Sequence, residues 1–394
     1  MRMTRRRWHG LIALLSLVLL LSACGQLNPT SGGEKPAAGL LQVHYLDVGQ
    51  ADAILVQFPA GVNLLIDAGN DADAPLVINY LRQVGVETLN IVVGTHPHAD
   101  HIGALDDVIL AFPVGDVYLP NVIQNTRTFE NLLEAIDTRG LSISEAKAGV
   151  ELPVGAGAAA VILAPVKDEY AKLNDYSVVI RAELGEHSFL FTGDAEVRAE
   201  RDMLESGAEL QANVLKVGHH GGATSTSGEF LERVQPEYAV ISVGRDNEYG
   251  HPHLETMARL AEAGVAIYRT DQQGTIVAIT DGVTLEFNEA AIRIPRVTIV
   301  AVDRKAEVAT IRNDEEFLLD ITGWKLVSEV GNQIYTIPAG TTLGAGQSLQ
   351  IVSGPQAKPA ADTLVWTTNN IWNNDHDPAA LYDADGNLIH RLDR

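Results

Sequence analysis

The stretch THPHADH, residues 95–101, places three histidines and one aspartate within seven residues. His96 and His98 are two residues apart, so an extended segment would point both imidazoles the same way. Asp100 and His101 follow within reach of a second ion. Imidazole and carboxylate groups suit zinc, and also manganese or iron. Because a short apolar strand is expected directly before it, at residues 90–93, we interpret the stretch as a metal-binding loop and not as a polar surface loop.

The first 24 residues carry the features of an export signal. Four arginines precede an apolar run over residues 11–21, which is shorter than the roughly 20 residues that a membrane-spanning helix needs. The sequence LSAC, residues 21–24, resembles a bacterial lipobox, which implies that Cys24 is lipidated and starts the mature chain. We therefore expect a signal peptide at residues 1–24, a flexible tether at residues 25–39, and a lipid anchor on the outer face of the bacterial cell membrane.

Composition limits the chemistry that the chain can perform. It has 1 cysteine, Cys24, so an internal disulfide and a cysteine metal ligand are both excluded, and His, Asp and Glu must hold any metal. The formal net charge is −23, which argues against a general basic surface for nucleic acid. A polyanionic substrate would need a local positive site, which bound metal cations could supply.

Two regions of different periodicity follow the tether. Over residues 40–292, strand patterns alternate with helical ones, for example a hairpin pattern at residues 53–66 and a helical pattern at residues 74–84. Beyond residue 292 only short strand-like runs occur, separated by Gly, Pro, Asn and Asp. We predict an α/β domain at residues 40–292 and a small all-β sandwich at residues 293–394.

The metal-binding pattern HxHxDH after a strand resembles that of the metallo-β-lactamase superfamily. The resemblance implies an αββα sandwich, an earlier aspartate that supports the ligands, a later bridging aspartate and a later histidine. Asp67 in LLIDAG matches the first aspartate, Asp194 in FLFTGD the bridging one, and the histidine should lie in KVGHHGG, residues 216–222. The predicted metal ligands are His96, His98, Asp100, His101, Asp194 and His220.

Further motifs narrow the resemblance to the soluble hydrolase domain of ComEC-type DNA-uptake proteins. They cover about residues 40–286 and comprise LDVGQADA, THPHADHIGA, NDYSVVI, FTGDA, LKVGHHGG, YGHPH and YRTDQQG. No further long apolar run is present, so we do not expect a DNA-import channel from this chain alone. Many superfamily members have another histidine before the bridging aspartate. Here only His187 lies in that interval, at the expected far end of the strand, so the first metal site should lack one ligand.

The late histidines allow more than one assignment. Along an extended strand His219 and His220 would point to opposite sides, so only one can bind metal without a turn. The resemblance favours His220 as ligand, with His251 as the next candidate, and leaves His219 a supporting or substrate-facing role or an ordinary place in a hydrogen-bonded loop. We predict that Asp100 also orients the nucleophile and that His251 or His219 protonates the leaving oxygen. Substrate contacts are predicted at Lys216, Ser225 and His253, the last close to an anion-favouring helix N-terminus.

The second region, residues 293–394, resembles a lamin-tail domain, a small immunoglobulin-like sandwich. Trp324 and Trp372 are expected in its core, and its sequence contains no cluster of catalytic residues. We expect it to bind or position another macromolecule.

Together these features predict a metal-dependent hydrolase with two divalent ions, most readily zinc and otherwise manganese. Its nucleophile would be a hydroxide formed from metal-bound water, whose pKa the metal lowers, and its substrate a phosphodiester. DNA is favoured by resemblance alone. Cell-wall phosphodiesters, lactones, thioesters and β-lactams are alternative substrates. A non-enzymatic alternative is a surface protein that binds DNA or wall polymer.

Overall fold

The computed structural model describes residues 39–155, 157–292, 295–384 and 386–393. The predicted signal peptide, Cys24 and residues 25–38 of the tether lie outside the described residues. Within the described ranges, no helix combines the length and the apolar character needed to cross a membrane.

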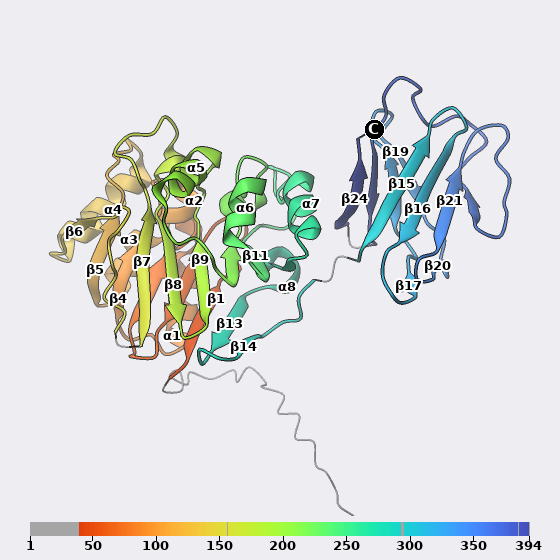
Figure 1. Ribbon diagram of the computed structural model, residues 1–394. Coiled ribbons are helices and arrows are strands. Elements are labelled where there is room, and N and C mark those ends of the chain that lie inside the picture. The colour runs from red at the N-terminus through yellow and green to blue at the C-terminus, as the bar shows by residue number, and fades with distance from the viewer. Residues whose placement is uncertain (1–38, 156, 293–294, 385, 394) are drawn as a thin grey trace, which may run out of the picture. The chain divides into compact units, whose positions relative to one another are not determined.

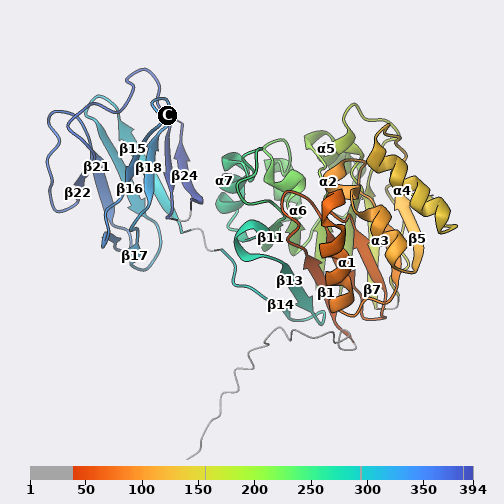
Figure 2. The ribbon, with the colours of Figure 1, turned by 180° about the vertical axis from the view of Figure 1, so that it is seen from behind.

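Residues 39–292, the N-terminal region, form two stacked β-sheets with helices on both outer faces (Figures 1 and 2). One sheet has eight strands in the order β14-β13-β1-β2-β3-β4-β5-β6, and the other has six in the order β12-β11-β10-β9-β8-β7. The first sheet consists of β1 (Leu41–Tyr45), β2 (Ile54–Gln57), β3 (Asn63–Ile66), β4 (Leu89–Val93), β5 (Val114–Leu119), β6 (Ile143–Glu145), β13 (Ile276–Thr280) and β14 (Leu285–Phe287). The second consists of β7 (Ala158–Ala164), β8 (Val179–Leu184), β9 (His187–Phe191), β10 (Val214–Lys216), β11 (Tyr238–Ile241) and β12 (Ala266–Arg269).

Helices cover the outer face of each sheet. On the first sheet these are α1 (Ala74–Gln83), α3 (Leu105–Ala111) and α4 (Arg127–Thr138), and on the second α5 (Val197–Ser206), α6 (Gly228–Val234) and α7 (Leu254–Glu262). Shorter elements lie in the loops: α2 (Ala99–Ile102), α8 (Thr270–Gln273), η1 (Asp71–Asp73), η2 (Leu173–Tyr176) and η3 (Gly218–Gly221). This arrangement confirms the αββα sandwich expected from the sequence.

Burial on both faces explains why the central strands are apolar throughout. On β4, Ile91 and Val93 face the opposite sheet, whereas Val92 packs under the helices, and all three are fully buried. The helices bury one face each, as α4 does with Phe129, Leu132, Ala135 and Ile136. The side-chain oxygen of Thr126 begins α4 by accepting a hydrogen bond from the Phe129 N–H at 3.3 Å.

Strand direction gathers the ends of four strands at one edge. Strands β3 and β4 pair in parallel in the first sheet, and β9 and β10 pair in parallel in the second. The carboxyl ends of parallel neighbours meet on one side of a sheet, where ligand sites form in α/β proteins. The loops that leave these four ends carry Asp67, the stretch at residues 95–101, Asp194 and the histidines of η3.

Residues 295–393, the C-terminal region, are all-β in the described ranges and have a hydrophobic core of their own. Trp324 and Trp372 are buried in this core at 5% and 3% exposure, as expected. Its strands are β15 (Val297–Asp303), β16 (Val308–Asn313), β17 (Leu319–Asp320), β18 (Lys325–Ser328), β19 (Gln333–Thr336), β20 (Thr342–Leu343), β21 (Ser348–Val352), β22 (Thr363–Val365), β23 (Ala379–Tyr382) and β24 (Leu388–Leu392). Two four-stranded sheets, β15-β16-β21-β22 and β19-β18-β23-β24, carry most of them.

We propose the boundary at residue 292, because none of the hydrophobic clusters of the described residues contains members from both regions. Fragments 40–292 and 293–394 should each unfold cooperatively, and limited proteolysis of the chain should cut near the boundary. A fragment ending at residue 272 is the control, since it lacks β13, the partner of β1, and should not fold. Recovery of no stable fragment near residue 292 would contradict the boundary.

The buried His44 on β1 should make the unfolding free energy depend on pH. Burial lowers its pKa from 6.5 to about 4, against a hydrogen bond with Gln57 that raises it. The unfolded chain therefore takes up this proton at a higher pH than the folded chain does. Stability should fall as the pH decreases from about 6.5 to about 4, by up to about 3 kcal/mol from this group.

Urea unfolding at a series of pH values would test this effect. His44→Gln should flatten the decrease, whereas the same change at the exposed His376 should leave it as in the wild type. Equal pH dependence of wild type and His44→Gln would show that His44 is not responsible.

Candidate metal centre

The loop after β4 brings the histidine cluster to the surface end of the sheet. His96 is buried at 1% exposure, and its Nε2 lies 2.8 Å from Nδ1 of His98. The chain then turns at His98 into α2, which carries Asp100 and His101 in one helical turn. The local turn, and not an extended segment, thus brings the two imidazoles of the HxH pair together.

Asp67 fixes this loop and orients one ligand. Its Oδ1 accepts a hydrogen bond from the Thr95 N–H at 2.7 Å, and its Oδ2 accepts one from the Thr95 hydroxyl at 2.6 Å. The same Oδ2 lies 2.8 Å from Nδ1 of His101. A carboxylate at Nδ1 leaves Nε2 of His101 free to face the centre, which is how supporting carboxylates set metal-binding histidines. These contacts are consistent with the supporting role proposed for Asp67.

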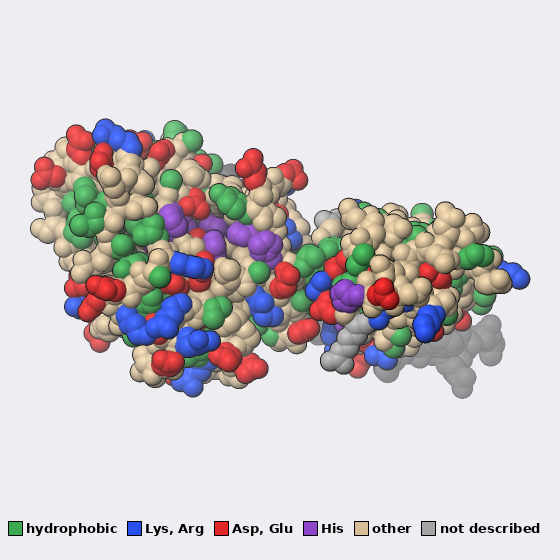
Figure 3. Space-filling view, turned by 90° about the horizontal axis from the view of Figure 1, so that it is seen from above, with side chains coloured by type: hydrophobic (Ala, Val, Ile, Leu, Met, Phe, Trp, Pro, Cys, Tyr) green, Lys and Arg blue, Asp and Glu red, His purple; other side chains and the backbone are tan. Residues whose placement is uncertain are grey.

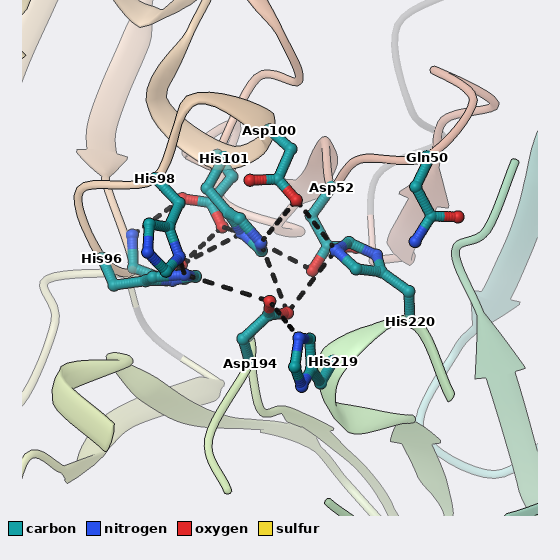
Figure 4. Close-up of polar contacts among 12 residues, drawn as sticks. Gln50, Asp52, His96, His98, Asp100, His101, Asp194, His219 and His220 are labelled. Atoms are coloured by element: carbon teal, nitrogen blue, oxygen red, sulfur yellow. Dashed lines mark hydrogen bonds and ion pairs between the residues drawn. The ribbon is translucent and has the colours of Figure 1, made fainter. Parts of the chain in front are cut away.

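Asp194 lies at the middle of the site, in the loop after β9 (Figure 4). Its Oδ1 is 3.3 Å from Nε2 of His101 and 3.6 Å from Nε2 of His220. Its Oδ2 is 3.9 Å from Nε2 of His96 and 3.7 Å from Nε2 of His219. Each carboxylate oxygen therefore faces two imidazoles, which is the arrangement that a bridging ligand requires.

The backbone of η3 decides how the two adjacent histidines point. His219 and His220 both have left-handed conformations, with φ of 52° and 53°. Each such non-glycine residue costs about 1–3 kcal/mol, so the surrounding structure must hold it. The tight turn sends both rings toward Asp194, unlike the opposite orientations expected from strand alternation. Gly221 follows at φ +85°, and a Cβ there would lie 2.5 Å from Cβ of Pro252.

Four side chains form a compact donor group: Asp100, His101, Asp194 and His220, with one ligand atom from each within 4.8 Å of the others. Nδ1 of His220 lies 3.0 Å from the Ser242 carbonyl oxygen, so it donates there and leaves Nε2 toward the group. Nε2 of His101, Nε2 of His220 and Oδ1 of Asp194 are buried and have no hydrogen-bond partner among the described residues. Buried polar atoms need partners, and two imidazole nitrogens with two carboxylates suit a divalent cation such as zinc. The residues therefore fit the predicted second ion.

Electrostatics in the cluster point the same way. Burial alone would raise the pKa of Asp194, but His101, His220 and His96 hold it well below its usual range. Burial would lower the pKa of His101, but Asp194, Asp100 and Asp67 keep it well above its usual range. The concentration of carboxylates at this position therefore favours positive charge.

The donors for the first ion are less tightly gathered. They are His96, His98 and Oδ2 of Asp194, and the two histidines are not part of the compact group. The NDYS stretch supplies support and no extra histidine: the Ser177 hydroxyl accepts from the Asp194 N–H at 3.0 Å and lies 3.3 Å from Nδ1 of His96. His187 begins β9 at the end away from Asp194, and its Nδ1 lies 2.6 Å from the Thr280 hydroxyl. His219 adds an imidazole on the Oδ2 side of Asp194, at 3.7 Å.

Two of the predicted substrate contacts do not match the structure. Lys216 is fully buried, and its Nζ pairs with Asp52 at 2.5 Å. Ser225 is also fully buried. A substrate arriving from solvent would reach neither side chain. His253 is half-buried, and its Nδ1 accepts a hydrogen bond from the Ala223 N–H at 3.0 Å.

Asp52 and Gln50 are site residues that sequence reasoning did not assign. Asp52 is 1% exposed, and its carboxylate lies 3.6 Å from Nδ1 of His220 and 3.8 Å from Nδ1 of His101. The Gln50 amide nitrogen lies 3.3 Å from Nδ1 of His251. Both belong to the motif LDVGQADA, whose resemblance assigns a role to neither residue. Their position next to the histidines comes from the pairing of β1 and β2 and could not be read from the motif.

Burial shifts the pKa values of the outer histidines. It lowers the pKa of His251 to about 4 and also lowers that of His219. Burial therefore favours the neutral form of both rings, which can form hydrogen bonds. The general-acid role of His251 or His219 stays a prediction.

Comparisons with known proteins agree with the fold. The family model described as the metallo-beta-lactamase superfamily matches residues 46–245, and the chain belongs to this superfamily. The model of the lamin tail domain matches residues 290–394. The relatives include ComE operon protein 3 of Bacillus subtilis (strain 168), 31% identical over 252 residues, and competence protein ComA of Neisseria gonorrhoeae, 31% identical over 263 residues. These confirm the resemblance to ComEC-type proteins.

The matched stretches cover 60% and 66% of this chain, and 32% and 34% of those two relatives. The chain thus spans about a third of the length of the curated relatives it matches. Among solved structures, Igni18, a metallo hydrolase from Ignicoccus hospitalis, is 16% identical with a TM-score of 0.40, covering 60% of this chain and 98% of that one.

Substitution of the bridging carboxylate should affect both ions at once. Asp194→Asn should lower the affinity for each by at least about a hundredfold, since even supporting residues of metal ligands contribute 10–100-fold. His96→Ala should weaken mainly the first ion. Metal content after dialysis, measured by mass spectrometry, would test both expectations. Asp116→Asn, on the exposed side of β5, is the matched control and should keep both ions. Retention of one full equivalent by Asp194→Asn would contradict the bridging role.

Proposed function

We propose that this metallo-β-lactamase superfamily hydrolase is a phosphodiesterase that acts on nucleic acid, with DNA as the favoured substrate. The observation that carries the proposal is Asp194, whose two carboxylate oxygens each face two imidazoles at the carboxyl ends of the strands. Two cations sharing one carboxylate can stabilise both the attacking and the leaving oxygen of a displacement at phosphorus. The similarity to proteins named for competence supports nucleic acid as the substrate class.

Two divalent ions, when bound, would lower the pKa of water and neutralise charge on the phosphate. Zinc is favoured by the imidazole and carboxylate donors, and manganese is the alternative. Compactness of the second group predicts that His101, His220, Asp100 and Asp194 hold their ion more tightly than His96 and His98 hold theirs.

Asp100 is suited to orient the attacking water. Its side chain is 34% exposed, whereas that of Asp194 is 3% exposed, so Asp100 lies at the mouth of the centre. Burial would raise the pKa of Asp100, but His101 and His220 hold it below its usual range. The carboxylate is therefore ionised and can accept a hydrogen bond from water.

His219 and His251 are suited to contact phosphate oxygens. Their ring centroids are 5.4 Å apart, and His219 retains 26% side-chain exposure. Either ring can donate a hydrogen bond to a phosphate oxygen. Protonation of the leaving oxygen by His251 or His219 stays a prediction.

The alternatives use the same donors. Lactones, thioesters and β-lactams need a similar centre, and they remain the competing substrates of this proposal. A purely binding protein is disfavoured because it has no need for two strained histidines and buried polar atoms without partners. The lipid anchor at Cys24 and the binding of another macromolecule by the C-terminal region stay predictions from the sequence.

Activity measured beside metal content would test the proposal. The chain from Gly25, loaded with zinc or manganese, should cleave bis-p-nitrophenyl phosphate and single-stranded DNA. His220→Ala should reduce the rate by at least about a hundredfold, because loss of a catalytic metal removes several kcal/mol of stabilisation. His187→Gln, which changes a histidine away from the centre, is the control and should keep the rate.

Two outcomes would overturn parts of the proposal. Cleavage of a lactone or a β-lactam but of no phosphodiester would leave the hydrolase and reject the substrate. Failure to retain either metal would reject the enzyme and favour the binding protein.

A further inference from the structure

Hydrogen bonds tie the loop between β11 and α7 together beside the candidate metal centre. The Asn247 amide nitrogen donates to the carbonyl oxygens of Gly244 and His251 at 2.9 and 2.6 Å, and its carbonyl oxygen accepts from the His251 N–H at 3.0 Å. Gln50 braces the loop from the other sheet, since its carbonyl oxygen accepts from the Gly244 N–H at 3.0 Å. One side chain therefore closes the loop on itself, and the residues it encloses are held in place.

An exposed aromatic side chain lies on this loop. Tyr249 is 68% exposed, more than any other aromatic side chain of the described residues, and it belongs to none of their hydrophobic clusters. Its ring stacks on His251 with centroids 5.7 Å apart and an interplanar angle of 29°. His251 in turn stacks near His220 at 6.5 Å, so a series of rings leads from the metal donors outward to Tyr249. Figure 3 shows the histidine side chains gathered on this face.

The loop also borders an open cavity of about 750 Å³, lined by Gly250, His251, Asn247 and Arg245 among others. Arg245 is exposed, and its guanidinium donates to the Asp271 carbonyl oxygen at 2.9 and 3.2 Å. Asp246 and Asp271 also line the cavity, and Asp271 pairs with Arg269. Within the described ranges Arg245 forms no ion pair with a carboxylate. In a chain with a net charge of −23, such a cation beside the centre is a local site for an anion.

We propose that Tyr249 and Arg245 form a nucleotide-binding subsite next to the metal centre. The ring of Tyr249 stacks on a nucleobase, and Arg245 contacts a phosphate of the same strand. This inference rests on the proposed function and specifies its substrate as single-stranded nucleic acid, because the faces of paired bases in a duplex are covered by their neighbours. Stacking on an exposed, pre-positioned ring is tolerant of sequence, so the subsite should not select among bases.

The test compares a labelled twelve-residue thymidine oligonucleotide with an abasic strand of the same length, which keeps the phosphates but lacks the bases. With the metal-loaded chain, KM and kcat are measured for both strands. Wild type should prefer the strand with bases through its KM, and Tyr249→Ala should reduce this preference by at least about fivefold. Tyr249→Trp should retain the preference, and Tyr249→Leu, which is apolar but has no ring, should lose it.

Arg245→Gln should raise KM for both strands alike, since both carry phosphates. An unchanged preference in Tyr249→Ala, or a full preference in Tyr249→Leu, would overturn the subsite. If wild type cleaves no strand, the proposed function fails, and equilibrium binding by fluorescence anisotropy then decides the subsite. Tighter binding of the strand with bases that depends on Tyr249 would support it, and no such difference would reject it.

Discussion

The site depends on one buried carboxylate, that of Asp194, placed among four imidazoles. At 2% exposure it has lost nearly all contact with water, and only neighbouring positive charge keeps it ionised. A bound cation would satisfy the same requirement more completely, because it would be held by the atoms of Asp194, His101 and His220 that have no partner among the described residues. The demand for positive charge therefore explains both the ligand set and its depth below the surface.

A layer of supporting contacts beneath the ligands keeps this arrangement in place. Asp67 holds His101, Ser242 holds His220, and Ser177 holds the backbone of Asp194. The pair of Lys216 and Asp52 lies below them, and its full burial means that removing either partner would leave an unpaired charge in the interior. The strained left-handed conformations of His219 and His220 persist because the packed neighbours hold the backbone in them.

Much of the fold was readable from the sequence where burial is strong. The helix expected at residues 74–84 is α1, and the hairpin expected at residues 53–66 is β2 and β3, because these elements bury a continuous apolar face or strand. No elements were assigned between α2 and η2, where the structure has two helices and three strands. For β5, which is half-exposed, and β6, which is fully exposed, the alternation of apolar and polar residues that marks a strand is weak. The helix α4, in contrast, buries a continuous apolar face that a helical pattern would show.

For the site, the sequence by itself determined the residue types and the superfamily, since HxHxDH, Asp67, Asp194 and the HHG stretch carry their chemistry in short motifs. Only the tertiary structure decided which way the rings point. The consecutive left-handed conformations of His219 and His220 turn both rings toward Asp194. Alternation along a strand predicts opposite orientations for the two rings. The fold also buried Lys216 and Ser225 and brought Asp52 and Gln50 to the histidines. The reason is physical: orientation and burial depend on contacts between segments far apart in the chain, and a motif records only its own segment.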